Sequence, residues 1–155
     1  MTTNIKKFLK KFKAHQQMSL DASAKVINAT VEEMFKKIVD RTPVGDPSLW
    51  SYPAPAGYNP GTLRASWGKV YNSRGAGRNL KTGRFESIKQ NMSRGGVSFK
   101  VGNNKAQNVL IYNNQPYAQR VETGWSTQAP QGMMRITVAE YIGIIKGFAA
   151  RYRIR

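Results

Sequence analysis

The chain has 155 residues, with 25 Lys and Arg against 8 Asp and Glu, a single histidine and no cysteine. This length suits one domain, predicted over residues 1–155, that buries about 70% of its surface without a disulfide or a metal to hold it. The composition excludes disulfides, thiolate nucleophiles, cysteine-based metal sites and any mechanism that needs two histidines. We therefore predict a protein that is not an enzyme, with no catalytic, cofactor or metal site.

The net charge of +17 is spread along the whole chain. It exceeds the magnitude of about 2–8 that serves solubility in a small domain, which indicates a polyanionic neighbour such as nucleic acid or an acidic protein or membrane surface. No apolar run approaches the roughly 20 residues of a membrane-spanning helix. The basic N-terminus is also not followed by an apolar run of about 7–15 residues, as a signal peptide would require. We expect a protein made in the cytoplasm, with no membrane span.

The N-terminal part of the chain has the pattern of one long helix. Apolar residues recur every three or four positions over residues 5–12, with lysines between them, and again over residues 20–38. Polar residues 15–17 separate the two stretches. We predict one long helix, interrupted or not at these residues, that ends near Arg41 because the following Thr-Pro pair, with Pro43, disfavours helix.

Two loops carry aromatic residues. The first is a proline-rich insertion over residues 45–59, and the second spans residues 123–132. Prolines lower the entropy cost of ordering a loop on a partner, and exposed aromatic side chains are frequent interface anchors. Core packing is the alternative for the tryptophans, and Trp67 is assigned to the core. The predicted partner interface consists of Trp50, Tyr52, Tyr58 and Trp125.

The middle of the chain is rich in β-branched and aromatic residues. The predicted strands are Thr62–Asn72, Val97–Val101 and Val109–Tyr112. In the first of them, Leu63, Ala65 and Trp67 alternate with polar residues, which is typical of a half-buried strand. From Met134 to Phe148 the apolar residues again recur at helical spacing, which predicts a closing amphipathic helix.

A segment rich in glycine and basic residues lies between the first two predicted strands. We predict a flexible basic loop over about residues 73–96, because like charges repel and glycine weakens strand order. We expect this loop to contact an acidic partner or DNA, and a solvated loop without a partner is the alternative. The residues expected to make the contact are Arg74, Arg78, Lys81 and Arg84.

Three short motifs, in order along the chain, resemble a known family. They are Arg41–Val44 (RTPV) with Pro60–Trp67 (PGTLRASW), Pro116–Gly124 (PYAQRVETG) and Ala129–Met133 (APQGM). They are similar to the signature of the tail-completion, or head–tail joining, proteins of tailed bacteriophages, the minor tail protein Z-like or neck proteins. The insertion between the two halves of the first motif departs from the family pattern. The matching positions, expected to have structural roles, are Gly61, Leu63, Arg64, Ser66, Tyr117, Ala118, Glu122, Gly124 and Pro130.

The resemblance implies an α+β fold, with a small mixed or antiparallel sheet packed against a long N-terminal helix and a C-terminal helix. It implies a virion structural protein, made in the host cytoplasm, that completes the tail and joins it to the head at the neck. Its expected partners are the tail terminator and the head-completion or connector proteins. Its copies are expected to form a ring, taken to be a hexamer, around DNA that is not read by sequence.

Other interpretations of the chain stay open. One is a nonspecific nucleic-acid-binding protein, and another is a peripheral membrane protein that uses the basic N-terminal helix. Because the copies are strongly cationic, we expect a free monomer or weak oligomer that forms its ring only on its neighbours. Within the motifs, Gly61 and Gly124 are predicted at positive φ in turns, and Glu122 has many arginines available as partners.

Overall fold

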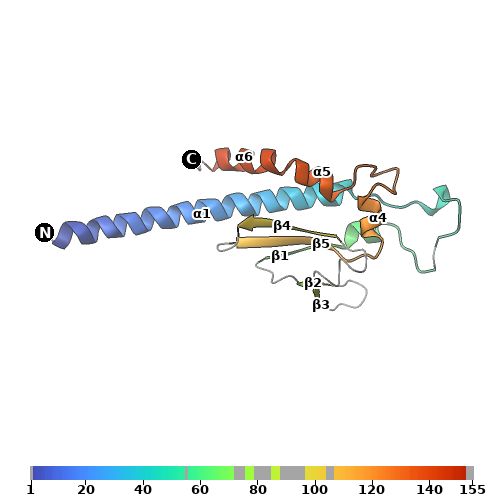
Figure 1. Cartoon of the computed structure of the whole chain (residues 1–155), viewed down its shortest axis with the longest axis horizontal. Coiled ribbons are helices and arrows are strands. Elements are labelled where there is room, and N and C mark those ends of the chain that lie inside the picture. The colour runs from blue at the N-terminus through green and yellow to red at the C-terminus, as the bar shows by residue number, and fades with distance from the viewer. Residues whose placement is uncertain are drawn as a thin grey trace.

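The computed structural model describes residues 2–54, 56–71, 76–78, 85–87, 97–103 and 107–152. Helix α1 (Thr2–Arg41) lies between a sheet on one side and helices α5 (Met134–Ala139) and α6 (Tyr141–Arg151) on the other (Figure 1). This arrangement confirms the predicted α+β class with a long N-terminal helix and helical C-terminal part. Three short helices lie near the C-terminal end of α1: η1 (Pro47–Leu49), α2 (Thr62–Ala65) and α4 (Ala118–Glu122).

The main sheet has three antiparallel strands in the order β1 (Trp67–Tyr71), β5 (Gln107–Asn113) and β4 (Val97–Asn103). Trp67 of β1 and Val97 of β4 both lie opposite Asn113 of β5. The strands predicted to begin at Val97 and Val109 are therefore confirmed, and each is longer than predicted. A separate antiparallel ladder joins β2 (Ala76–Arg78) to β3 (Phe85–Ser87).

Much of the predicted basic loop lies outside the described residues. Arg74, Lys81 and Arg84 belong to that part, and Arg78 is described only as backbone of β2. The flexibility of residues 73–96 and the contact of these four side chains with an acidic partner or DNA therefore stay predictions.

The core forms where α1 packs on the sheet. Val31, Met34 and Ile38 are fully buried, and their spacing of three and four residues places them on one face of the helix. They pack in one cluster with Val109 of β5, and burial of such side chains is the main favourable contribution to folding. Trp67 is 7% exposed and belongs to the same cluster, which confirms its predicted place in the core.

α1 is a single helix that ends where the sequence predicts. It is continuous through residues 15–17, so no break occurs there. After Arg41, the Thr42 hydroxyl donates a hydrogen bond to the Ile38 carbonyl at 2.6 Å. Pro43 follows and cannot continue the helix, since it lacks the backbone N–H.

Glu140 joins the end of α1 to the C-terminal helices. The one closing helix predicted from Met134 is divided at Glu140 into α5 and α6. The Arg41 guanidinium donates to the Glu140 carboxylate at 2.6 Å and to the Thr137 hydroxyl at 2.9 Å, and the Lys37 ammonium lies 3.2 Å from the same carboxylate. The hydrogen bond from Arg41, and then that from Lys37, holds the pKa of Glu140 below its usual range.

The strand predicted from residue 62 is wrong in its first part, because α2 takes those residues as helix and the strand begins only at Trp67. The predicted alternation placed Ala65 inside and Ser66 outside, yet Ser66 is buried and Ala65 is exposed. Leu63, Ser66 and Trp67 follow the i, i+3, i+4 spacing of a helical turn. Over so few residues that spacing resembles alternation, since both patterns bury Leu63 and Trp67.

The N-terminal part of α1 extends beyond the rest of the molecule (Figure 1). Every side chain from Ile5 to Asp21 is exposed, and the first half-buried one is that of Ala22. We call residues 5–20 the arm and the described residues from 21 onward the body. Among the described residues, the arm is therefore a helix without tertiary packing on any of its faces.

Candidate partner-binding pocket

The proline-rich loop begins with a fixed turn. The Asp46 carboxylate accepts hydrogen bonds from the Ser48 backbone N–H at 2.9 Å and from the Ser48 hydroxyl at 2.7 Å. These two bonds lower the pKa of Asp46 below its usual value, the hydroxyl having the larger effect and the backbone N–H the smaller. Pro47 opens η1, where the missing N–H needs no partner. These contacts fix the backbone that presents Leu49 and Trp50.

Trp50 and Tyr58 bring the two ends of the loop together. Their ring centroids lie 4.8 Å apart at an interplanar angle of 59°, and the Tyr58 hydroxyl donates to the Gly45 carbonyl at 3.3 Å. A Cβ atom at Gly45 would lie 2.2 Å from the Tyr58 hydroxyl oxygen and 3.0 Å from Trp50. Glycine at this position therefore lets the two aromatic rings close onto the loop.

The facing wall comes from α4 and the loop after it. Tyr117 precedes α4 and is half-buried; burial, and then the nearby Tyr58, raises its pKa. Trp125, in the second loop, is 77% exposed, and the Arg120 guanidinium lies 5.3 Å from its ring centroid in a cation–π contact. This wall thus holds a large apolar ring in solvent beside a fixed positive charge.

The two walls enclose a cavity of about 580 Å³ that we call the aromatic pocket. The residues that line it include Leu49, Trp50, Tyr58, Tyr117, Val121 and Trp125. Asp46 and Arg120, both exposed, also line it and add one charge of each sign. A concave, mainly apolar surface with a few polar groups suits the binding of an apolar or aromatic side chain, or a turn, from another molecule.

The structure brings together three of the four aromatic residues predicted at an interface. Trp50, Tyr58 and Trp125 line the aromatic pocket, whereas Tyr52 is 75% exposed and does not line it. Sequence reasoning missed Leu49, which lines the pocket and is 76% exposed. The available signal was its position beside a tryptophan in a proline-rich segment, where the sequence predicts no strand or helix face for an apolar residue.

Glu122 bonds the second motif to the third. Its carboxylate accepts from three successive backbone N–H groups at the start of α5, those of Met133 and Met134 at 2.9 Å and that of Arg135 at 2.6 Å. A carboxylate there satisfies N–H groups that have no partner within the helix. The arginine next to it in the structure, Arg135, donates to the Glu122 backbone carbonyl and not to the carboxylate, and no ion pair of this carboxylate occurs among the described residues.

The two halves of the first motif are also bonded, on either side of the insertion. The Arg64 guanidinium donates to the Thr42 carbonyl at 2.9 and 2.7 Å, and the Trp67 indole N–H donates to the Thr42 hydroxyl at 2.7 Å. The Gln115 side-chain amide donates to the Ser66 hydroxyl at 2.7 Å. The insertion therefore leaves both halves of the motif in contact, and two of its aromatic residues, Trp50 and Tyr58, line the pocket.

The remaining motif residues lie in turns or in the hydrophobic core. Gly61 and Gly124 have φ of 79° and 93°, which confirms the predicted positive φ. A Cβ at Gly124 would lie 2.6 Å from the Pro130 carbonyl oxygen, so a side chain is excluded there. Leu63 and Ala118 are buried in the core cluster.

The part of the chain that the structure describes was searched for a metal-binding cluster and for a membrane-crossing helix. Within it, no three His, Asp or Glu side chains gather as a metal ion requires, and no helix is long and apolar enough to cross a membrane. Comparison with models of known protein families, with curated proteins and with solved structures gives no match.

Proposed function

We propose that this chain is a virion structural protein of a tailed phage that completes the end of the tail and joins it to the head. The observation that carries the proposal is that the two halves of the first family-like motif bond to each other, and that the second motif bonds to the third. Arg64 reaches Thr42 across the insertion, and Glu122 reaches the start of α5. Short matches that arose by chance would have no reason to meet in the fold through their polar residues.

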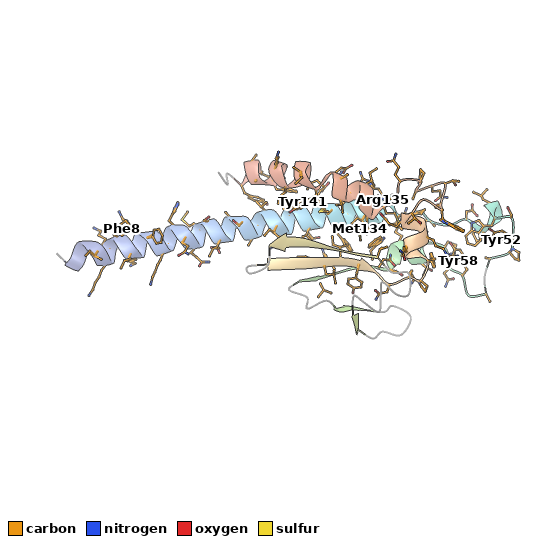
Figure 2. The ribbon with its side chains drawn as sticks, in the orientation of Figure 1. Phe8, Tyr52, Tyr58, Met134, Arg135 and Tyr141 are labelled. Atoms are coloured by element: carbon orange, nitrogen blue, oxygen red, sulfur yellow. The ribbon has the colours of Figure 1, made fainter. Side chains whose placement is uncertain are left out.

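A joining protein needs surfaces that face different neighbours. Figure 2 places Tyr52 and Tyr58 at one end of the molecule and Phe8 of the arm at the other. Trp125, largely exposed at the pocket, is a side chain of the type that anchors interfaces. We infer that the aromatic pocket receives a side chain or turn of a tail-terminator, head-completion or connector protein.

The charge supports the same proposal. A net charge of +17 suits a ring of copies, proposed as a hexamer, with DNA in its lumen and no reading of its sequence. The same charge makes free copies repel one another, so the ring forms on neighbouring proteins. The proposed location is the head–tail neck of the virion.

One observation favours a second function, nonspecific binding of nucleic acid. The arm carries five lysines and no acidic residue. A protein of that kind would bind free duplex with an affinity that falls steeply with salt, and it would form no stable complex with tail components. The lysines of the arm are Lys6, Lys7, Lys10, Lys11 and Lys13.

Joining in vitro tests the proposal. A lysate of the phage without this chain should contain filled heads and separate tails, and addition of the purified chain should restore joined, infectious particles. Trp125→Ala should lower the yield about tenfold at unchanged Tm, since the ring is 77% exposed. Tyr152→Ala, an exposed aromatic residue that does not line the pocket, is the matched control and should join normally. Normal joining in the lysate without the chain would contradict the proposal.

A further inference from the structure

The arm has an apolar stripe that no other part of the described chain covers. Ile5, Phe8, Leu9 and Phe12 lie at helical spacing and are 61%, 65%, 47% and 58% exposed. The Phe8 and Phe12 rings stack with centroids 6.3 Å apart, so they form one continuous apolar surface. Figure 2 shows Phe8 on a part of α1 that no other element approaches. Four large apolar side chains on one face of an exposed helix are typical of a binding surface.

The stripe continues a face of α1 that is covered in the body. Residues eighteen positions apart are separated by about five helical turns and so lie on the same face. Phe8 is thereby aligned with Val26, and Phe12 with Thr30, both of which are buried. The same side of α1 is thus covered in the body and bare in the arm.

The element on that side is the pair α5–α6. Thr30 lies one turn after Val26, and Lys37 two turns after Thr30, so the three share a face. Lys37 contacts Glu140, at the junction of α5 and α6. Figure 1 shows α6 running back along α1 and ending well short of the N-terminus. α6 therefore covers only the body part of α1, and a helix that continued its line would lie beside the stripe.

Charge and shape select the occupant. All five lysines of the arm lie off the stripe, and the first acidic residue of the chain is Asp21. A second copy would bring a basic element to the stripe, since its arm has the same five lysines and its α6 has Lys146 and Arg151, and each would repel the arm. A flat bilayer would meet α6 before it could lie along the stripe, because both are on the same side of α1.

We propose that the arm binds an acidic amphipathic helix of another protein, which packs on the stripe in line with α6. Its apolar face covers Phe8 and Phe12, and its acidic residues face the lysines on either side of the stripe. This inference does not rest on the function proposed above, since it follows from the arm and from its alignment with α6.

The experiment uses the full chain and a labelled peptide of about 18 residues, with leucines at i, i+3, i+4 and i+7 and glutamates elsewhere. A peptide of the same composition with the leucines distributed around the helix is the reference. Fluorescence anisotropy at 50 mM salt should show at least about tenfold tighter binding of the striped peptide. Phe8→Ala with Phe12→Ala should remove this preference, and Met18→Ala, on another face of the arm and 69% exposed, should keep it.

Four outcomes would overturn the proposal. Equal binding of both peptides would mean charge attraction alone, and an unchanged preference in the double alanine variant would place the site elsewhere. If the chain bound vesicles of phosphatidylserine and phosphatidylcholine more tightly than the striped peptide, and the double variant lost this binding, the arm would be a membrane anchor. Self-association by sedimentation that depends on Phe8 and Phe12 would make the partner a second copy. An unchanged Tm of the double variant shows that the fold is intact.

Discussion

The two halves of α1 have the same kind of sequence and opposite surroundings. In the body, Val31, Met34 and Ile38 are fully buried, while in the arm Phe8 and Phe12 are more than half exposed. Helical periodicity alone therefore does not decide which apolar face enters the core. That is decided by the sheet and by α6, which cover only one half of the helix. The body half stabilises the fold, and the arm half is available for another molecule.

The largest expected difference between the halves is in how much a substitution lowers the stability of the protein. Met34→Ala removes a side chain with no exposed surface and should lower the free energy of unfolding by about 2–5 kcal/mol. This corresponds to a fall in Tm of roughly 5–15 °C for a chain of this size. Met18→Ala, the same substitution in the arm where the side chain is 69% exposed, should leave Tm unchanged within about 1 °C. An equal fall in Tm for the two variants would contradict the distinction between a packed half and an unpacked half of α1.

The next effect concerns the contact between the motifs in the body. Glu122→Ala leaves three backbone N–H groups at the start of α5 without their acceptor and should cost about 2–3 kcal/mol. Calorimetry should show a fall in Tm of roughly 5–10 °C. Asp40→Ala, at an exposed acid on α1, is the control and should change Tm little. An equal effect of the two would show that Glu122 does not hold the motifs together.

A smaller effect should depend on pH. The pKa of Glu140 is lowered from its ordinary value of 4.5, mainly by Arg41, so its carboxylate stabilises the fold fully above about pH 4.5 and progressively less as pH falls through the lowered pKa. Glu140→Gln should therefore be less stable than the native chain at pH 7 and equal to it at strongly acidic pH. Urea unfolding at several pH values measures the difference. A constant difference at all pH values would exclude an ionic contribution of Glu140.

The smallest effect should be a gain. Gly147 lies inside α6, and a Cβ atom there would meet nothing within 4 Å. Gly147→Ala should stabilise the free chain by about 0.5–1 kcal/mol, since alanine restricts the unfolded chain and favours helix. A rise in Tm of about 2–3 °C is expected. A fall would show that this face of α6 is more crowded than the structure indicates.

The long elements could be predicted from the sequence because each repeats its pattern over many residues. α1 has enough turns for its periodicity to be clear, and the pair Thr42-Pro43 marks its end. The positive φ at Gly61 and Gly124 was predictable from their place in turns. α2 was not, since its four residues cannot separate helical spacing from alternation.

The sequence could predict which types of residue form the candidate site, but it could not predict how they are arranged. The aromatic residues of two loops were identified, but which of them share a pocket depends on contacts such as that of Tyr58 with Gly45. The partner of Glu122 was missed because many arginines were available and backbone N–H groups leave no signal in a sequence. Long-range contacts of this kind are set by the whole fold.

Hydrogen exchange along α1, in the free chain and in joined particles, tests most directly the claim that one half of this helix folds the body and the other binds a partner. In the free chain, the amides of residues 26–41 should be strongly protected and those of the arm weakly, because an exposed helix without packing frays. In joined particles, the arm should gain protection of about tenfold or more while residues 26–41 change little. Equal protection of both halves in the free chain, or an arm that exchanges as fast in the particle as in solution, would contradict the account.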